Sequence, residues 1–159
     1  MEHSIWYIEL CDKIDALTSE FTEKETKKYQ INWLKKLLDK LDYFQESCSD
    51  CVELKNSMDN LLIDLELIKN DPNHSTDQYF TSINNLYQHL KTSHKVVVSR
   101  HYVHLGIIAG VIIGLIITFV FKDLIPGTMK YGFNTSIIIG FATGFYLDKK
   151  ATSEYRMLV

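Results

Sequence analysis

The sequence predicts an all-α protein in which a cytoplasmic helical bundle or coiled-coil domain is followed by a two-helix transmembrane hairpin. Three observations lead to this prediction. Residues 103–121 are almost entirely apolar, and the seventeen residues from 105 to 121 carry no charge, which is near the shortest helix that crosses a bilayer. Residues 1–100 place apolar side chains at helical spacing and contain no glycine. Strand patterns are missing apart from the three valines at 96–98.

Four amphipathic helices are expected in the first hundred residues, which we assign to one domain. They cover residues 4–21, about 31–44, about 47–68, and a stretch that begins at Thr76 or Asp77. A polar stretch, TEKETKK, separates the first two. The inward-facing positions include Leu10, Ile14, Leu34, Leu41, Leu61, Leu65, Phe80, Ile83 and Leu90. Because neither glycine nor proline occurs between residues 79 and 104, the fourth helix can continue directly into the first span.

Residues 101–159 are expected to form the membrane hairpin, with spans at about 103–121 and 132–147, a turn at Pro126-Gly127 and a tail at 148–159. Small residues recur at every fourth position of both spans, and this spacing lets two helices approach each other closely. The packing positions are Gly106, Gly110, Gly114, Gly132, Ser136, Gly140 and Gly144. The alternative is a pair of buried helices in the core of a soluble protein.

Charge predicts the location and the orientation. Residues 1–100 carry 12 Lys and Arg against 17 Asp and Glu, whereas residues 101–159 carry 5 against 3. Six basic residues flank the outer ends of the two spans, and two lie in the loop between them. The positive-inside rule therefore places both termini in the cytoplasm, at a bacterial inner membrane. No basic start with an apolar run, as in a signal peptide, is found near the N-terminus.

Polar side chains within the spans suggest what the hairpin does. The candidate pore-lining residues are Thr118, Asn134, Thr135, Ser136 and Thr143. Polar groups in a membrane usually face a bundle interior or a water-filled cavity. We therefore expect a homo-oligomer, such as a tetrameric ring, with the small-residue stripes packing neighbouring protomers. The alternative is that the stripes only fasten the two spans within one protomer, and that the hairpin contacts membrane lipid as a simple anchor.

Two groups of basic residues are candidates for binding an anionic ligand or lipid. The first is Lys24, Lys27, Lys28, Lys35 and Lys36 with Trp33, where lysines could bind phosphates and the aromatic ring could stack on a base. The second is Lys91, Lys95, Arg100 and His101, in a histidine-containing segment that also includes His89, His94 and His104. The alternatives are a solvated face balanced by glutamates for the first group, and attraction to anionic inner-leaflet lipids for the second.

The cysteines are weak metal candidates. Cys48 and Cys51 form a CxxC pair that supplies two of the four ligands that zinc needs. Cys11 with His3 or His74 would complete the set only if the fold brought them together. The alternative, which we prefer, is a helix start with Cys51 in the core, so no metal or other cofactor is expected and the thiols are reduced. Catalytic motifs are missing, and the chain is not expected to be an enzyme.

The last 55 or so residues, ending in LDKKATSEYRMLV (residues 147–159), resemble short bacterial membrane proteins of unassigned function with two Gly-spaced spans and a basic tail. The layout of the whole chain is similar to that of small membrane effectors of bacterial anti-phage systems, in particular the Hailong-type channel subunit. This resemblance implies an oligomeric ion channel gated by a nucleotide or oligonucleotide that a partner enzyme, encoded nearby, produces. The other hypotheses are a non-conducting coiled-coil adaptor and a metal- or thiol-dependent sensor.

Overall fold

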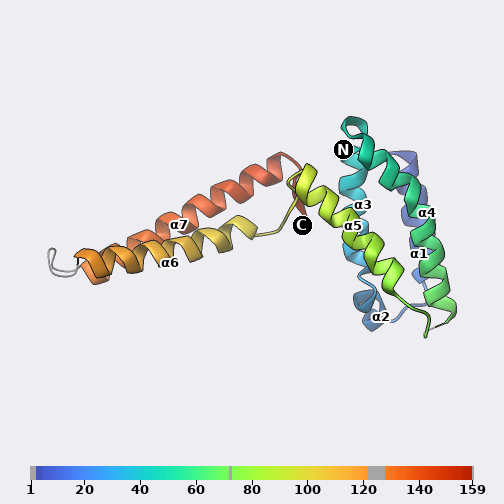
Figure 1. Cartoon of the computed structure of the whole chain (residues 1–159), viewed down its shortest axis with the longest axis horizontal. Helices are drawn as coiled ribbons and strands as arrows, with labels where there is room; N and C mark the ends of the chain where they lie inside the picture. The colour runs from blue at the N-terminus through green and yellow to red at the C-terminus, as the bar shows by residue number, and fades with distance from the viewer. Residues whose placement is uncertain (1–2, 72, 122–127, 159) are drawn as a thin grey trace. The chain divides into compact units, whose positions relative to one another are not determined.

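The computed structural model describes residues 3–71, 73–121 and 128–158, and this part of the chain is mostly helical (Figure 1). It therefore confirms the all-α class and the helical bundle. The chain divides into two compact units, Met1–Lys95 and Val96–Val159. The structure determines each unit separately, and the two are described in turn.

Over residues 3–71 and 73–95, the N-terminal unit forms a bundle of five α-helices with one short 3-10 turn. These elements are α1 (Ile5–Thr18), α2 (Glu23–Lys28), α3 (Ile31–Phe44), η1 (Gln45–Ser47), α4 (Ser49–Asn70) and α5 (Asp77–Ser93). Helix α3 contacts α1, α2, α4 and α5. Its Leu34, Leu37, Leu38 and Leu41 are completely buried. Each buried leucine stabilises the fold by roughly 1.5–3 kcal/mol relative to an exposed one, so α3 is the centre of the core.

Two details of the bundle differ from the sequence prediction. The polar stretch expected between the first two helices contains α2, which begins with a reciprocal cap between Thr22 and Glu25. This capping box satisfies backbone donors that would otherwise lack partners. Helix α5 buries Tyr79, whereas the predicted core residue Phe80 is only half-buried. The Tyr79 hydroxyl donates a buried hydrogen bond of 2.8 Å to the Tyr29 carbonyl, which compensates for burying a phenol.

Helix α5 does not continue into the next helix, so that prediction was wrong. It ends at Ser93, and both Lys95 and Arg100 adopt left-handed backbone conformations, with φ of 53° and 63°. Strand β1 (Val97–Val98) lies between them and pairs in parallel with β2 (Met157–Leu158). Backbone hydrogen bonds to a strand sixty residues away in the sequence thus replace helical ones. A local pattern of glycine and proline does not report such long-range pairing.

The C-terminal unit consists of α6 (His101–Phe121) and α7 (Thr128–Ser153), which lie side by side (Figure 1), together with β1 and β2. Among the described residues, α6 alone is long and apolar enough to cross a membrane, over His101–Val120. Helix α7 is longer than the predicted second span and includes Lys149 and Lys150. The predicted turn at residues 126–127 lies outside the described residues.

Candidate metal centre and the hairpin interface

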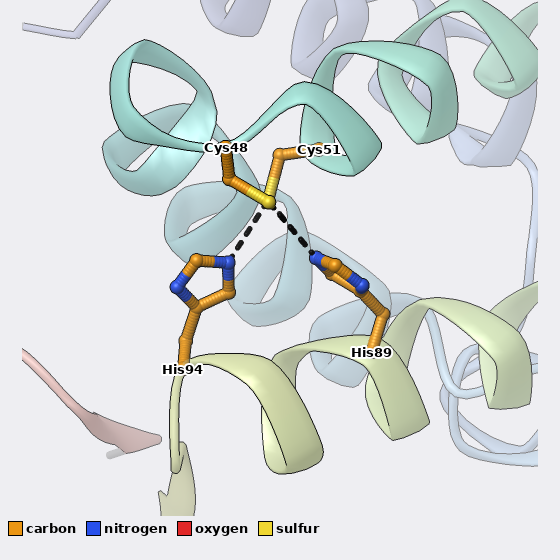
Figure 2. A group of neighbouring side chains, drawn as sticks. All are labelled: Cys48, Cys51, His89 and His94. Carbon is orange, nitrogen blue, oxygen red and sulfur yellow. Dashed lines mark hydrogen bonds between the residues drawn. The ribbon is translucent and has the colours of Figure 1, made fainter.

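Two cysteines and two histidines converge at one end of the bundle. Figure 2 shows Cys48 and Cys51, at the start of α4, facing His89 and His94, at the end of α5. One ligand atom from each side chain lies within 4.8 Å of the corresponding atoms of the other three. The Cys51 sulfur lies 3.3 Å from Nε2 of His89 and 3.2 Å from Nε2 of His94. The Cys48 sulfur lies 3.5 Å from Nε2 of His89.

Helix ends hold these four residues in place. Cys48 has an extended backbone (φ −144°) and occupies the N-cap of α4, and Cys51 lies one turn further on. His89 lies near the end of α5, and His94 is its C-cap residue. Helices α4 and α5 pack against each other, so the beginning of one meets the end of the other. Cys51 is buried, and the other three are half-buried.

Neighbouring side chains orient the two imidazole rings. The His94 ring stacks on Phe44, with centroids 4.1 Å apart and an interplanar angle of 16°. Nδ1 of His89 lies 3.5 Å from the Ser93 hydroxyl. Both rings therefore direct Nε2 toward the sulfurs, and contacts on the far side of a histidine commonly fix the nitrogen that binds a metal.

Burial shifts the pKa of two of the four side chains, Cys51 and His94. It raises the pKa of the Cys51 thiol to about 12, with a further contribution from the hydrogen bond with Cys48. Burial, followed by the charge of His89, lowers the pKa of His94 below its ordinary value of 6.5. At neutral pH the Cys51 thiol is thus protonated and His94 is neutral, because a buried site disfavours isolated charge.

The remaining residues of the predicted metal set lie elsewhere. The four-residue cluster contains neither Cys11 nor His3 nor His74. Cys11 is half-buried in α1, and burial raises the pKa of its thiol. His3 stacks on Tyr7. The sequence reasoning therefore missed His89 and His94, which it placed in a membrane-proximal basic segment. Their H-x4-H spacing after a CxxC pair was the signal that could have revealed them.

The glycine stripes meet at the interface between α6 and α7. A Cβ atom added to Gly106 would lie 2.1 Å from the Gly140 carbonyl oxygen, and one added to Gly140 would lie 2.2 Å from the Gly106 oxygen. Added Cβ atoms at Gly110 and Gly144 would likewise clash with the backbone of the opposite helix, at 2.6 and 2.3 Å. At Gly114 the nearest atom would belong to the Phe133 side chain, at 2.9 Å. These glycines therefore pack α6 against α7 within one chain.

The candidate pore-lining residues fall into two groups. The Thr118 hydroxyl is enclosed and has no hydrogen-bond partner among the described residues. The Ser136 hydroxyl donates to the Gly132 carbonyl, so this side chain is satisfied within α7. By contrast, Asn134, Thr135 and Thr143 are exposed on the outside of α7. The structure thus does not bring the five residues together within one chain.

The first basic group is partly neutralised. Lys27 pairs with Glu23, and Lys35 pairs with Asp15. Lys28 contacts the hydroxyl and the ring of Tyr29. Trp33 packs against Tyr87, with ring centroids 5.6 Å apart. Lys24 and Lys36 are exposed. The group is therefore a mixed surface of both charges, with its aromatic ring engaged by the bundle.

The second basic group is divided between the two units. In the bundle, Lys91 lies over the Tyr87 ring, and Lys95 is exposed. In the C-terminal unit, His101 is exposed at the start of α6, and Arg100 lines a cavity of about 810 Å³. The other lining residues are Ser99, Val103, Phe141, Phe145, Asp148, Lys149, Thr152, Ser153 and Met157. This cavity combines two cations with an apolar wall, whereas its one carboxylate, on Asp148, accepts hydrogen bonds from the Tyr102 and Val103 amides.

Comparisons of the chain with protein-family models, with curated proteins and with solved structures find no match.

Proposed function

We propose that the chain is a membrane protein of the bacterial inner membrane, in which α6 and α7 cross the bilayer and the bundle lies in the cytoplasm. The exposed surface of α6 supports this proposal most strongly. From residue 105 to residue 120 its exposed large side chains are all apolar: Leu105, Ile108, Ile112, Ile113, Leu115, Ile116, Phe119 and Val120. A continuous apolar surface of this kind is unfavourable in water and fits a lipid environment.

Helix α7 completes the hairpin. Its outer surface exposes Ile138, Ile139, Phe141 and Phe145. Its 26 residues correspond to roughly 39 Å of helix, which exceeds a hydrocarbon core of about 30 Å. Lys149 and Lys150 can therefore reach the cytoplasmic headgroup region while the apolar part stays in lipid. Two spans also bring both termini to the same side of the membrane.

We propose further that the hairpins assemble into a homo-oligomeric ion channel. The observation that carries this step is the exposure of Asn134, Thr135 and Thr143 on the outer surface of α7. Polar side chains at membrane depth are more favourable against a partner helix or a water-filled pore than against lipid. Because the glycines are used within the protomer, neighbouring protomers would meet through this outer surface of α7.

The proposed channel is gated through the cytoplasmic bundle. A ligand shifts such an equilibrium only by binding the open and closed states unequally. An anionic nucleotide or oligonucleotide, made by a partner enzyme encoded nearby, is the proposed signal, and the layout shared with anti-phage effectors is what supports it. Arg100, which belongs to the predicted membrane-proximal group, lines the cavity of the C-terminal unit together with Lys149, and these two cations are the proposed contacts for the anion.

A second candidate is a non-conducting membrane-anchored adaptor. Two observations favour it: the glycine stripes are satisfied within one hairpin, and α4 exposes Ile63 and Leu67 at 54% and 42%. Exposed apolar side chains on a helix often mark a surface for another helix. In this alternative the hairpin would only hold the bundle at the membrane.

The two candidates can be separated in cells. Induced expression of the full chain should depolarise the membrane, as measured with a potential-sensitive dye, and replacing both Asn134 and Thr135 by leucine should reduce the signal at least about tenfold, since a pore lined by apolar side chains dewets. Ile138→Val, an exposed apolar control, should retain it. Cross-linking in membranes tests assembly independently. A chain that stays monomeric would contradict the channel and favour the adaptor.

A further inference from the structure

We propose that Cys48, Cys51, His89 and His94 form a tetrahedral Zn²⁺ site that ties the start of α4 to the end of α5. This inference goes beyond the proposed function, because it concerns the bundle alone and holds whether or not the hairpin conducts ions. It rests on the geometry of the four side chains, their chemistry and their positions in the fold.

The separations of the ligand atoms fit one zinc ion. Zinc lies about 2.3 Å from a cysteine sulfur and about 2.0–2.1 Å from a histidine nitrogen, so tetrahedral coordination places sulfur and nitrogen about 3.6 Å apart. The three observed distances between sulfur and Nε2 are 3.2, 3.3 and 3.5 Å. No two of the four ligand atoms lie more than 4.8 Å apart, so side-chain movements would bring all four within coordination distance of one ion.

The chemistry of the four ligands selects zinc among common ions. Two sulfurs and two imidazoles in a tetrahedral arrangement are typical of zinc, whereas magnesium and calcium prefer oxygen ligands. Two thiolates also balance the double charge of the ion, so the half-buried centre carries no net charge. All four positions are occupied by protein, and this predicts a structural zinc rather than a catalytic one with an open position.

The spacing of the ligands follows that of known structural zinc sites. Cysteines separated by two residues and histidines separated by three to five are the usual pairs, and the chain has C-x2-C followed by H-x4-H. The metal would join segments about forty residues apart (Figure 2). Such a link reduces the conformational entropy of the unfolded chain. It would also hold the last turn of α5, since Leu90 is the last buried residue of this helix.

Metal content and cobalt spectroscopy test the site. The full chain, purified in mild detergent without chelator or metal-affinity resin, should contain one Zn²⁺ per molecule. After chelation and reduction, titration with Co²⁺ should give visible ligand-field bands of tetrahedral cobalt and a near-ultraviolet sulfur-to-cobalt band. Cys51→Ser and His94→Ala should weaken Co²⁺ binding by more than the roughly 10–100-fold typical of a second-shell change. Cys11→Ser and His101→Ala, outside the cluster, should leave it unchanged.

A ligand swap keeps the test decisive if a variant fails to fold. His94→Cys still offers four ligands and should bind Co²⁺ with a stronger sulfur-to-cobalt band, because three thiolates replace two. Three results would overturn the proposal: a reduced chain that binds neither Zn²⁺ nor Co²⁺, a Cys48–Cys51 disulfide in the full chain as purified in detergent, or a Cys11→Ser variant that loses as much metal as Cys51→Ser.

Discussion

The two units of this chain use the same kinds of apolar residues in opposite ways. Helix α3 buries its leucines completely, whereas α6 exposes most of its isoleucines and leucines. In the bundle, large side chains fill the core and the backbones stay apart. In the hairpin, small residues face inward and the backbones nearly touch. This difference fits the proposed membrane location of the hairpin, because a helix pair in lipid would gain little by hiding apolar side chains and would be held mainly by close backbone packing.

In each unit, side-chain contacts also connect the end of one helix to the start of another. In the bundle this connection is the Cys/His cluster between α4 and α5. In the C-terminal unit it is Asp148, which accepts hydrogen bonds of 3.0 and 3.2 Å from the first amides of α6, together with the pairing of β1 and β2.

Gly140→Leu should have the largest effect on the hairpin. A leucine at this position must displace the α6 backbone at Gly106, where even a Cβ atom would lie 2.2 Å from the carbonyl oxygen. We expect a loss of about 3 kcal/mol, at the upper end of overpacking costs. Hydrogen exchange during an SDS titration should show α6 and α7 opening earlier, with bundle peptides unchanged. Ile139→Leu, on the exposed side of α7, is the matched control. Equal behaviour of the two variants would contradict the packing account.

Tyr79→Phe should destabilise the bundle by about 1–2 kcal/mol, because the buried Tyr29 carbonyl loses its hydrogen-bond donor. Both tryptophans, Trp6 and Trp33, lie in the bundle, so their fluorescence during urea unfolding reports this unit alone. Tyr43→Phe, at an exposed ring, should change stability by less than about 0.5 kcal/mol. Similar losses for both variants would count against a specific role of the buried hydroxyl.

The stability difference between the native protein and Tyr79→Phe should also depend on pH. Burial raises the pKa of Tyr79 well above its ordinary value of 10.0, so the folded bundle keeps the phenol protonated. Above about pH 10 the unfolded chain can release this proton while the folded chain cannot. The native protein therefore loses stability as pH rises past 10, and Tyr79→Phe does not incur this loss. We expect the difference in free energy of unfolding between the native protein and Tyr79→Phe to become smaller from pH 9 to pH 11. A difference that grows over this range would contradict the prediction.

Asp148→Ala should have the smallest effect, about 1 kcal/mol, through the loss of a cap at the start of α6. The amides of Tyr102 and Val103 should exchange faster, while those in the middle of α6 should not change. Asp148→Asn should give exchange rates at these amides between those of the native protein and those of Asp148→Ala. The asparagine side-chain oxygen can still accept a hydrogen bond, but it carries no charge. Unchanged exchange at both amides in the alanine variant would show that the cap contributes nothing.

Much of the fold could be predicted from local patterns. Apolar spacing gave α3 with its bounds and placed α1, α4 and α5 within a few residues, because amphipathic helices need one buried stripe. The short α2 was missed, although Thr22 and Glu25 form a capping box that the sequence displays. The break after α5 was also missed. It depends on β1 pairing with β2, and the valines at 96–98 were its only local sign.

The histidine partners of the CxxC pair were not predicted from the sequence alone. The CxxC pair was evident, and its partners were sought at His3 and His74. The observed partners, His89 and His94, are near the cysteines only because α4 and α5 pack with the start of one beside the end of the other. That arrangement follows from how the whole bundle packs, not from residues near Cys48. The glycine stripes, in contrast, lie on regular helices with a fixed repeat, so their positions could be derived directly.

Hydrogen–deuterium exchange of the full chain in lipid nanodiscs, with and without a zinc chelator, should separate the two ways in which the units are held together. We expect a metal ion to hold one end of the bundle. The hairpin is held instead by protein contacts: the close packing of α6 on α7, the Asp148 hydrogen bonds and the pairing of β1 with β2. Chelation should raise exchange at residues 48–54 and 86–94 by at least about tenfold, as local opening becomes easier. Residues 106–118 and 136–146 should exchange as before. Identical exchange in the bundle with and without the chelator would contradict the account.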